Sequence, residues 1–155
     1  MTRKQKQAME PELEPSKIIT FTEGIPAFED EKEYYLLPLQ EGSPFFYLKS
    51  ARSDLCLLMT DPFTFFPDYQ IDFPDPLLNN LGVGESTSGL MVFCILTLGK
   101  DFKETTANLL APIIINAESR RGMQFIPQKA EYLSRHHLFP NTSEPGAAPG
   151  LKEGP

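Results

Sequence analysis

Apolar and polar residues alternate over several short stretches of this chain, a period of two that is typical of β-strands with one buried face. In one of them Leu55, Leu57 and Met59 fall on the same face. Turn signals such as Glu23-Gly24 and Glu41-Gly42 separate the stretches. The pattern predicts strands over residues 17–21, 33–39, 45–50, 55–60, 90–98, 113–115 and 123–127.

Two stretches depart from simple alternation. Residues 90–98 are continuously apolar, which predicts a strand buried on both faces. Residues 75–81 favour one or two helical turns that end at Gly82. Arg120-Arg121-Gly122 is the expected turn of a hairpin whose second arm is 123–127. Many short strands with few helices predict an all-β domain with one or two short helices, as a small closed or partly open β-barrel-like structure or a sandwich.

The 155 residues fit one globular domain with a core of its own. Residues 1–15 are polar and contain Pro11 and Pro15, so we expect a flexible or weakly paired N-terminal segment. The domain then spans 16–139. Residues 140–155 hold four prolines and three glycines with almost no large apolar side chain, which predicts a disordered C-terminal tail.

Charge and cysteine usage narrow the function classes. The formal net charge of -7 disfavours direct nucleic-acid binding, which needs clustered Lys and Arg; it suits a basic protein partner, and equally ordinary solubility. Cys56 and Cys94 lie in apolar runs and are expected to be buried free thiols. No apolar run reaches the roughly 18 residues of a membrane helix and no signal peptide is visible, so we expect a cytoplasmic protein.

The sequence offers little for catalysis. His136 and His137 are adjacent, so on a strand they point to opposite faces and are poorly placed to share a metal ion. The acidic run 29–31 is expected to be a solvated turn. We therefore predict no cofactor, no metal and no enzymatic activity. The alternatives left open are a small-molecule-binding β-barrel or enzyme, and a structural subunit of a larger assembly.

Three segments are unusual for a plain β domain. Residues 21–29 place Ile25 and Phe28 in a turn, where they could plug one end of a barrel. Residues 61–69 hold four aromatic rings and two prolines, which predicts a rigid bend or strand edge that is either core or a partner surface. Residues 106–116 carry two asparagines that could cap local turns.

Together these segments resemble the flagellar assembly factor FliW family. The matching stretches include IITFTEGIPAFED, TDPFTFFPDYQID and TANLLAPIIINAESRRGMQFI, in family order over roughly residues 16–137; Ala27 stands where the family often has glycine. The resemblance implies a small β-barrel-like protein without enzymatic activity. It implies binding of flagellin in the cytoplasm and, on release from flagellin, antagonism of the translational repressor CsrA, so that flagellin mRNA is translated.

Partner contacts are expected in the bend and in the third segment. Aromatic side chains dominate interface energies when a partner buries them, and Tyr69 joins a large apolar ring to a polar tip. We expect Tyr69→Ala to weaken a partner without unfolding the domain, unless the aromatic rings point inward. A monomer is expected. The predicted contact residues are Phe65, Asp68, Tyr69, Asn108, Pro112 and Asn116.

Overall fold

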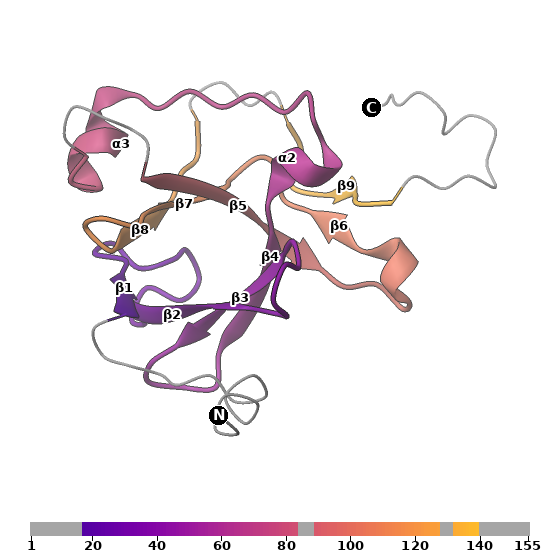
Figure 1. The fold of residues 1–155 in the computed structure, drawn as a ribbon, viewed down its shortest axis with the longest axis horizontal. Coiled ribbons are helices and arrows are strands. Elements are labelled where there is room, and N and C mark those ends of the chain that lie inside the picture. The colour runs from indigo at the N-terminus through magenta and orange to yellow at the C-terminus, as the bar shows by residue number, and fades with distance from the viewer. Residues whose placement is uncertain (1–16, 84–88, 128–131, 140–155) are drawn as a thin grey trace.

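The computed structural model describes residues 17–83, 89–127 and 132–139, which form a β-barrel with an added outer layer (Figure 1). The strands are β1 (Ile18–Thr20), β2 (Glu33–Pro38), β3 (Phe45–Ser50), β4 (Cys56–Thr60), β5 (Leu90–Thr97), β6 (Thr106–Ala107), β7 (Ile113–Asn116), β8 (Arg121–Gln124) and β9 (His136–His137). The short helices are α2 (Pro62–Phe65), α3 (Asp75–Asn80) and the 3₁₀ turn η2 (Phe102–Glu104).

Seven strands close the barrel in the order β4-β3-β2-β1-β8-β7-β5, with β5 pairing back onto β4. The pairings are antiparallel except for β1 with β8, which run parallel and meet at Thr20 and Arg121. There the Thr20 N–H donates to the carbonyl of Arg120 at 2.9 Å. Strands β6 and β9 extend from the far end of β5. The predicted all-β, barrel-like fold with short helices is confirmed.

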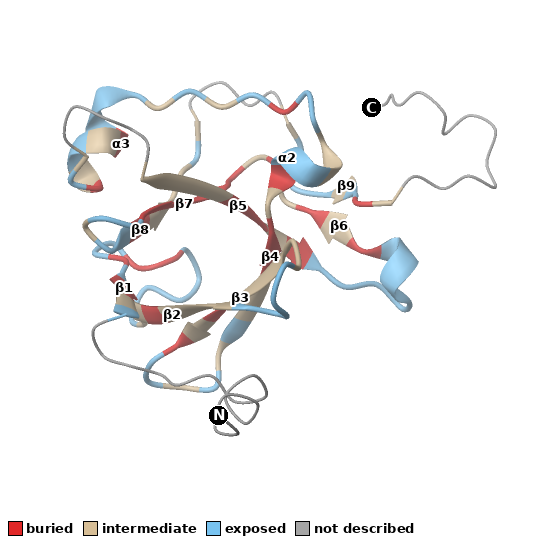
Figure 2. Cartoon of the chain, in the orientation of Figure 1, coloured by how far each residue is buried: buried red, intermediate tan, exposed pale blue. Residues whose placement is uncertain are grey.

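Buried residues lie on most of the strands that surround the barrel interior (red in Figure 2), and a cluster of apolar side chains forms its core. Phe21 and Tyr34 are fully buried and meet edge to face with their ring centroids 5.2 Å apart. The Phe21 ring lies so close to Gly122 that a Cβ there would come within 2.6 Å of Cζ, which explains the glycine in β8. The other buried members of this core are Ile19, Ile25, Leu48, Met59, Phe93, Ile113 and Ile115.

Strand β5 is covered on both faces, as its continuous apolar run predicted. Met91, Phe93 and Ile95 pack into the barrel core. Val92 and Cys94 belong to clusters on the outer face, which are completed by residues from outside the barrel. The domain therefore has two layers over this strand.

Six of the seven predicted strands agree with the observed ones to within one residue. The seventh, 123–127, corresponds to β8 but ends three residues too late, and the short strands β6 and β9 were not predicted. The hairpin turn was also placed too late. Asn116 pairs with Arg121, so the turn comprises residues 117–120, and Arg121 and Gly122 lie in β8. The Arg120 N–H donates to the Asn116 carbonyl at 2.8 Å, with Arg120 in the left-handed region at φ 57. The turn at the end of α3 was predicted correctly, since Gly82 has φ +68.

The segment 61–69 begins with a helical turn that the sequence analysis did not predict. Asp61 caps α2 by accepting a hydrogen bond from the Phe63 N–H at 2.9 Å. Pro62 occupies the first helical position, where no backbone donor is needed and the fixed φ suits a helix. The rule against proline in a helix interior therefore did not apply.

Two predictions of burial were only partly right. Cys94 is buried, but Cys56 is exposed at the start of β4. Ile25 is only 2% exposed and does plug the barrel core, whereas Phe28 is 38% exposed. The plug at this end of the barrel is thus Ile25 without Phe28.

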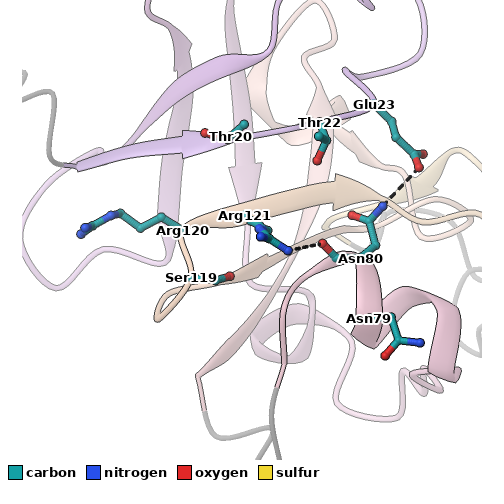
Figure 3. Close-up of a pocket in the computed structure, with 8 residues that line it drawn as sticks. All are labelled: Thr20, Thr22, Glu23, Asn79, Asn80, Ser119, Arg120 and Arg121. Carbon is teal, nitrogen blue, oxygen red and sulfur yellow. Dashed lines mark hydrogen bonds between the residues drawn. The ribbon is translucent and has the colours of Figure 1, made fainter.

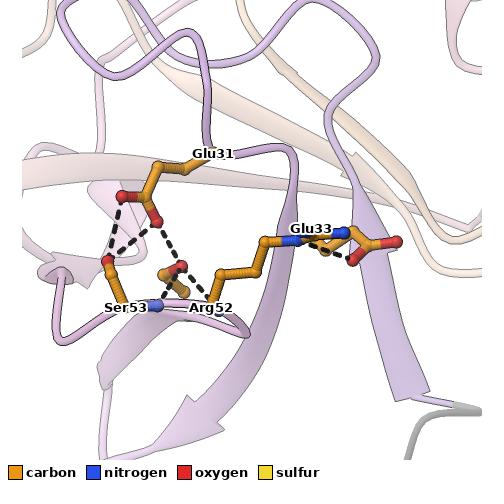
Figure 4. A network of polar contacts seen from close by, with 5 residues as sticks. Glu31, Glu33, Arg52 and Ser53 are labelled. Atoms are coloured by element: carbon orange, nitrogen blue, oxygen red, sulfur yellow. Dashed lines mark hydrogen bonds and ion pairs between the residues drawn. The ribbon is translucent and has the colours of Figure 1, made fainter.

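A polar network ties the loop before β2 to the turn between β3 and β4 (Figure 4). The Glu31 carboxylate accepts hydrogen bonds from the hydroxyls of Ser50 and Ser53, the latter at 2.8 and 2.9 Å. Ser50 Oγ in turn accepts the N–H groups of Arg52 and Ser53. Glu31 is therefore a turn anchor, although the acidic run was predicted to be solvated throughout.

The hydrogen bonds from Ser50 and then Ser53 lower the pKa of Glu31. A lowered folded-state pKa stabilises the protein above the carboxyl's ordinary pKa, and this stabilisation is lost as pH falls through the lowered value. We expect Glu31→Gln to lower the melting temperature most at neutral pH, with the difference from wild type shrinking in acid. Glu33→Gln is the control, because its pair with Arg52 at 3.5 Å is exposed. A constant difference from pH 7 to acid would contradict this account.

Ala27 has φ 79, a left-handed conformation in which a Cβ is strained, and this gives a physical reason for glycine at this position. Ala27→Gly should raise the free energy of unfolding by up to about 1 kcal/mol, because relief of strain outweighs the added freedom of the unfolded chain. Ala51→Gly, in an exposed bend without positive φ, should instead be neutral or destabilising by about 0.5–1 kcal/mol. Urea denaturation of both variants checks the difference in sign.

Candidate functional site

Between β4 and β5 the chain leaves the barrel and crosses its outer face through α2 and α3 (Figure 1). Leu77 and Leu81 of this crossing pack on Ile114, which faces outward from β7. We call residues 68–73 the strap. Its side chains alternate: Asp68, Gln70 and Asp72 are exposed, whereas Tyr69 is buried and Ile71 and Phe73 are half-buried. This period of two is that of an extended backbone with one face on the protein.

Tyr69 fixes the strap to the barrel. It is only 6% exposed, and its hydroxyl donates to the carbonyl of Leu109 at 2.9 Å. Burial raises its pKa. The ring lies 4.7 Å from that of Tyr132, whose hydroxyl accepts the Gln70 N–H at 3.1 Å. Tyr69 is therefore a core residue of the outer layer.

Leu109 belongs to a bulge that the sequence analysis did not foresee. Strand β5 advances three residues from Phe93 to Leu96, while its partner advances six residues from Ala107 to Ile113. The extra residues loop out and are held by Asn108, whose Oδ1 accepts the N–H groups of Leu110 and Ala111 at 3.1 and 3.0 Å.

Pro112 and Asn116 have structural neighbours too. Pro112 is buried, and its carbonyl accepts the Phe125 N–H at 2.9 Å. Asn116 is 4% exposed; its Nδ2 donates to the Leu81 carbonyl at 2.9 Å and its Oδ1 accepts the Glu118 N–H at 3.0 Å. Asn116 thus joins the end of α3 to the end of β7.

Phe65 is half-buried in a group of four phenylalanines. Its ring centroid lies 5.7 Å from that of Phe45 and 5.8 Å from that of Phe139. Phe102 closes the group, 5.7 Å from Phe45 and 5.3 Å from Phe139, and is itself 46% exposed. Phe63, from the same helix as Phe65, is 41% exposed.

The structure therefore brings together most of the predicted contact residues, but as a packed layer. Tyr69, Pro112 and Asn116 are buried, so an exposed aromatic anchor at Tyr69 was a wrong expectation. Asn108 caps a local turn, which was its alternative interpretation. Asp68 is exposed as a contact residue should be. Direct contact of any of the six with a partner stays a prediction.

Two apolar grooves flank the strap, and sequence reasoning missed both. One, of about 650 Å³, lies between the strap and residues 123–127; its apolar lining includes Ile71, Leu77, Leu109, Met123, Phe125 and Tyr132. The other, of about 520 Å³, is lined by Phe63, Tyr69, Gln70, Ile71, Asp72, Phe73, Leu90 and Val92. Ile126, at the rim of the first, is 57% exposed. The sequence signal that could have indicated the larger groove is the apolar run of residues 125–127, which follows the end of β8.

The stretch of sequence that contains the strap carries charge of one sign. The sequence has no Lys, Arg or His between Arg52 and Lys100, a stretch that contains Asp54, Asp61, Asp68, Asp72, Asp75 and Glu85. Asp68, Asp72 and Asp75 are exposed. The grooves therefore lie beside an acidic surface without a compensating cation from this stretch.

A third, polar hollow of about 550 Å³ lies where β1, α3 and the β7–β8 turn meet (Figure 3). Two side-chain hydrogen bonds join its lining residues: Asn80 Nδ2 donates to the Glu23 carboxylate at 3.2 Å, and Arg121 Nη1 donates to the Asn80 backbone carbonyl at 3.3 Å. These contacts join α3 to the barrel end. No nucleophile with a neighbouring base is present among its lining residues.

The histidines have separate surroundings in β9. His136 Nε2 accepts the Leu133 N–H at 2.8 Å, and burial lowers the pKa of His136, whereas His137 is exposed. Within the described ranges, no three His, Cys, Asp or Glu side chains come together as a metal-binding group. No helix in those ranges is long and apolar enough to span a membrane.

Comparison with known proteins identifies the family. The family model described as FliW protein matches residues 2–138. The chain belongs to the FliW family. The flagellar assembly factor FliW of Syntrophomonas wolfei is 46% identical over 132 residues, which cover 84% of each chain. That of Geobacillus kaustophilus is 43% identical over 131 residues, covering 83% of this chain and 89% of the relative.

A solved FliW structure agrees with this fold. The crystal structure of the flagellar assembly factor FliW superposes with a TM-score of 0.78 at 38% identity, covering 84% of this chain and 91% of that one. The resemblance predicted from the sequence motifs is confirmed. As a member of the FliW family, the chain falls in the functional class of flagellar assembly factors.

The contacts of Tyr69 in this FliW family member predict a stability defect. Tyr69→Phe should lower the free energy of unfolding by about 1–2 kcal/mol, because the Leu109 carbonyl loses its donor. Tyr69→Ala should lower it by about 3–5 kcal/mol, because a buried ring is also removed. Asp68→Ala, on the exposed side of the strap, should stay within about 0.5 kcal/mol of wild type. If Tyr69→Ala unfolded at the same urea concentration as wild type, the anchoring role would be wrong.

Proposed function

We propose that this chain binds flagellin in the cytoplasm and, when flagellin is exported, binds and antagonises the translational repressor CsrA, so that flagellin mRNA is translated. It does so as a protein-binding module without enzymatic activity. The observation that carries the proposal is the outer layer, where two apolar grooves lie beside the exposed carboxylates of Asp68 and Asp72. Family membership supports the flagellar context.

The acidic surface supports a basic partner. A protein that binds RNA presents clustered Lys and Arg to phosphates. The stretch between Arg52 and Lys100 contains carboxylates that could pair with these Lys and Arg side chains, and it contains no cation that would compete for them. Complementary fields raise association rates and select against acidic competitors, including nucleic acid itself.

The apolar grooves support protein partners in general. Apolar surface beside exposed charges is typical of protein-binding sites. Exposed side chains extend it, with Ile126 57% and Phe63 41% exposed. Flagellin is held before its export, so we propose that it occupies apolar surface of this layer and hinders the repressor from binding at the same time.

The main alternative was a barrel with a small-molecule site. Barrels that hold a ligand need interior space. Here the interior is occupied by Phe21, Tyr34 and Met59, all fully buried. The grooves instead lie outside the barrel, where a larger partner can reach them.

Titration of the purified chain with CsrA and with flagellin, singly and in competition, tests the proposal. We expect each partner to bind alone and flagellin to reduce CsrA binding. The association rate constant with CsrA should fall several-fold as the salt concentration rises from about 50 to about 500 mM, because screening shortens the range of the attraction.

Two outcomes would count against the proposal. A chain that binds neither partner lacks the proposed function. Salt-independent association with CsrA would remove charge complementarity as its basis, even if the two proteins bind. Light scattering of the same samples reports whether the free chain is the expected monomer.

A further inference from the structure

The strap is held by its side chains and hardly at all by its backbone. In the described part of the chain, the Tyr69 N–H donates to the Phe66 carbonyl at 2.9 Å and the Gln70 N–H to the Tyr132 hydroxyl at 3.1 Å. Among described residues, the N–H groups of Ile71, Asp72 and Phe73 make no hydrogen bond. The carbonyls of residues 69–73 likewise accept none from described residues. An extended segment with unpaired backbone groups is a template for strand addition.

The two edges of the strap differ. In an extended backbone, the N–H and C=O of one residue point to the same side, and those of the next residue point to the other side. Gln70 points its N–H toward Tyr132, which lines the larger groove. Ile71 and Phe73 therefore point theirs to the opposite side, toward the groove lined by Phe63, Leu90 and Val92. This second edge offers two complete donor and acceptor pairs.

We propose that an extended segment of CsrA adds to this edge of the strap as a new strand, paired through the backbone of Ile71 and Phe73. Its inward side chains are apolar and enter the groove lined by Phe63, Leu90 and Val92. Its outward side chains are cationic and lie beside Asp68 and Asp72, which the strap presents on its exposed face. This inference rests on the proposed function and assigns the binding of CsrA to the strap.

The geometry favours a strand over a helix as the occupant. A helix satisfies its own backbone groups, so it would cover the groove but leave the N–H groups of Ile71 and Phe73 without partners. An added strand would fill the groove with its apolar side chains and would also pair with the backbone groups of Ile71 and Phe73. The charge favours the repressor over flagellin, because the face beside this edge is acidic and the stretch that forms it has no cation.

Amide hydrogen exchange of the full chain, measured by NMR with and without CsrA, tests the pairing residue by residue. Addition of a strand should slow exchange at Ile71 and Phe73 at least tenfold and leave Asp72 nearly unchanged, because its N–H faces the other side. Such alternation is the signature of a strand; a covering helix or a distant contact would not produce it. A parallel sample with flagellin should show no alternating protection there.

A charge reversal tests the outward face. Asp68→Lys with Asp72→Lys should weaken CsrA binding at least tenfold. The matched control is Asp30→Lys with Glu41→Lys, which reverses two exposed carboxylates in the loops before β2 and β3 and should have at most a few-fold effect. Unchanged melting temperatures of both double variants show that the fold is kept.

The outcomes separate the inference from the proposed function. If CsrA binds the wild-type chain without protecting Ile71 and Phe73, or binds both double variants alike, the strap is not its site and the inference is overturned alone. Alternating protection by flagellin instead of CsrA would overturn the choice of partner. If wild-type chain does not bind CsrA, the proposed function fails and the inference fails with it.

Discussion

The outer residues of β5 impose the main constraint on this fold. Val92, Cys94 and Leu96 face away from the barrel, yet they are as apolar as the residues that face into it. Left bare, such a strand would expose apolar area at a cost of about 25 cal/mol per Å². The chain covers it with the crossing between β4 and β5, the bulge after β6 and the segment around β9. The second layer is thus a requirement of β5, and the two apolar grooves beside the strap lie in that layer.

The strap shows how this layer combines stability with accessibility. Its apolar side chains pack against the barrel, and Tyr69 adds a hydrogen bond to the Leu109 carbonyl. Asp68 and Asp72 are exposed to solvent. It runs from α2 to α3 without joining the sheet (Figure 1). A segment anchored mainly through alternate side chains keeps its shape but leaves the backbone groups of Ile71 and Phe73 without described partners, which is the condition for recognition by strand pairing.

Local sequence patterns predicted the strands of the barrel well, because the apolar and polar positions within each strand are enough to identify it. Alternation identified the strand around Leu57, the continuous run identified the two-sided burial of β5, and Gly82 marked the end of α3. The family resemblance rested on long motifs, and it was confirmed. Closure through the single parallel contact of Thr20 with Arg121 could not be predicted, since it joins strands a hundred residues apart.

The candidate site was less predictable because its residues act over long range. The hydroxyl of Tyr69 finds its acceptor at Leu109, forty residues later, and Asn116 finds the Leu81 carbonyl thirty-five residues earlier. Composition showed that Tyr69 is amphipathic but not on which side its polar end lies. Helix α2 was not predicted because Pro62 and Pro67 were interpreted as helix breakers, although Asp61-Pro62 is a favourable helix start and Pro67 lies outside the helix. Asp68 is exposed, which is compatible with its predicted partner contact, and that contact stays a prediction.

The two cysteines differ in a way that makes the outer layer observable. Cys56 is exposed on β4, whereas Cys94 is buried beneath that layer, in the same cluster as Tyr69. Burial raises the pKa of the Cys94 thiol to about 12, so it is protonated and unreactive while covered. A thiol reagent therefore modifies Cys56 in the closed molecule and Cys94 only when the layer lifts from β5. The rate at which a thiol reagent modifies Cys94 in the native chain would therefore report how often the outer layer exposes β5.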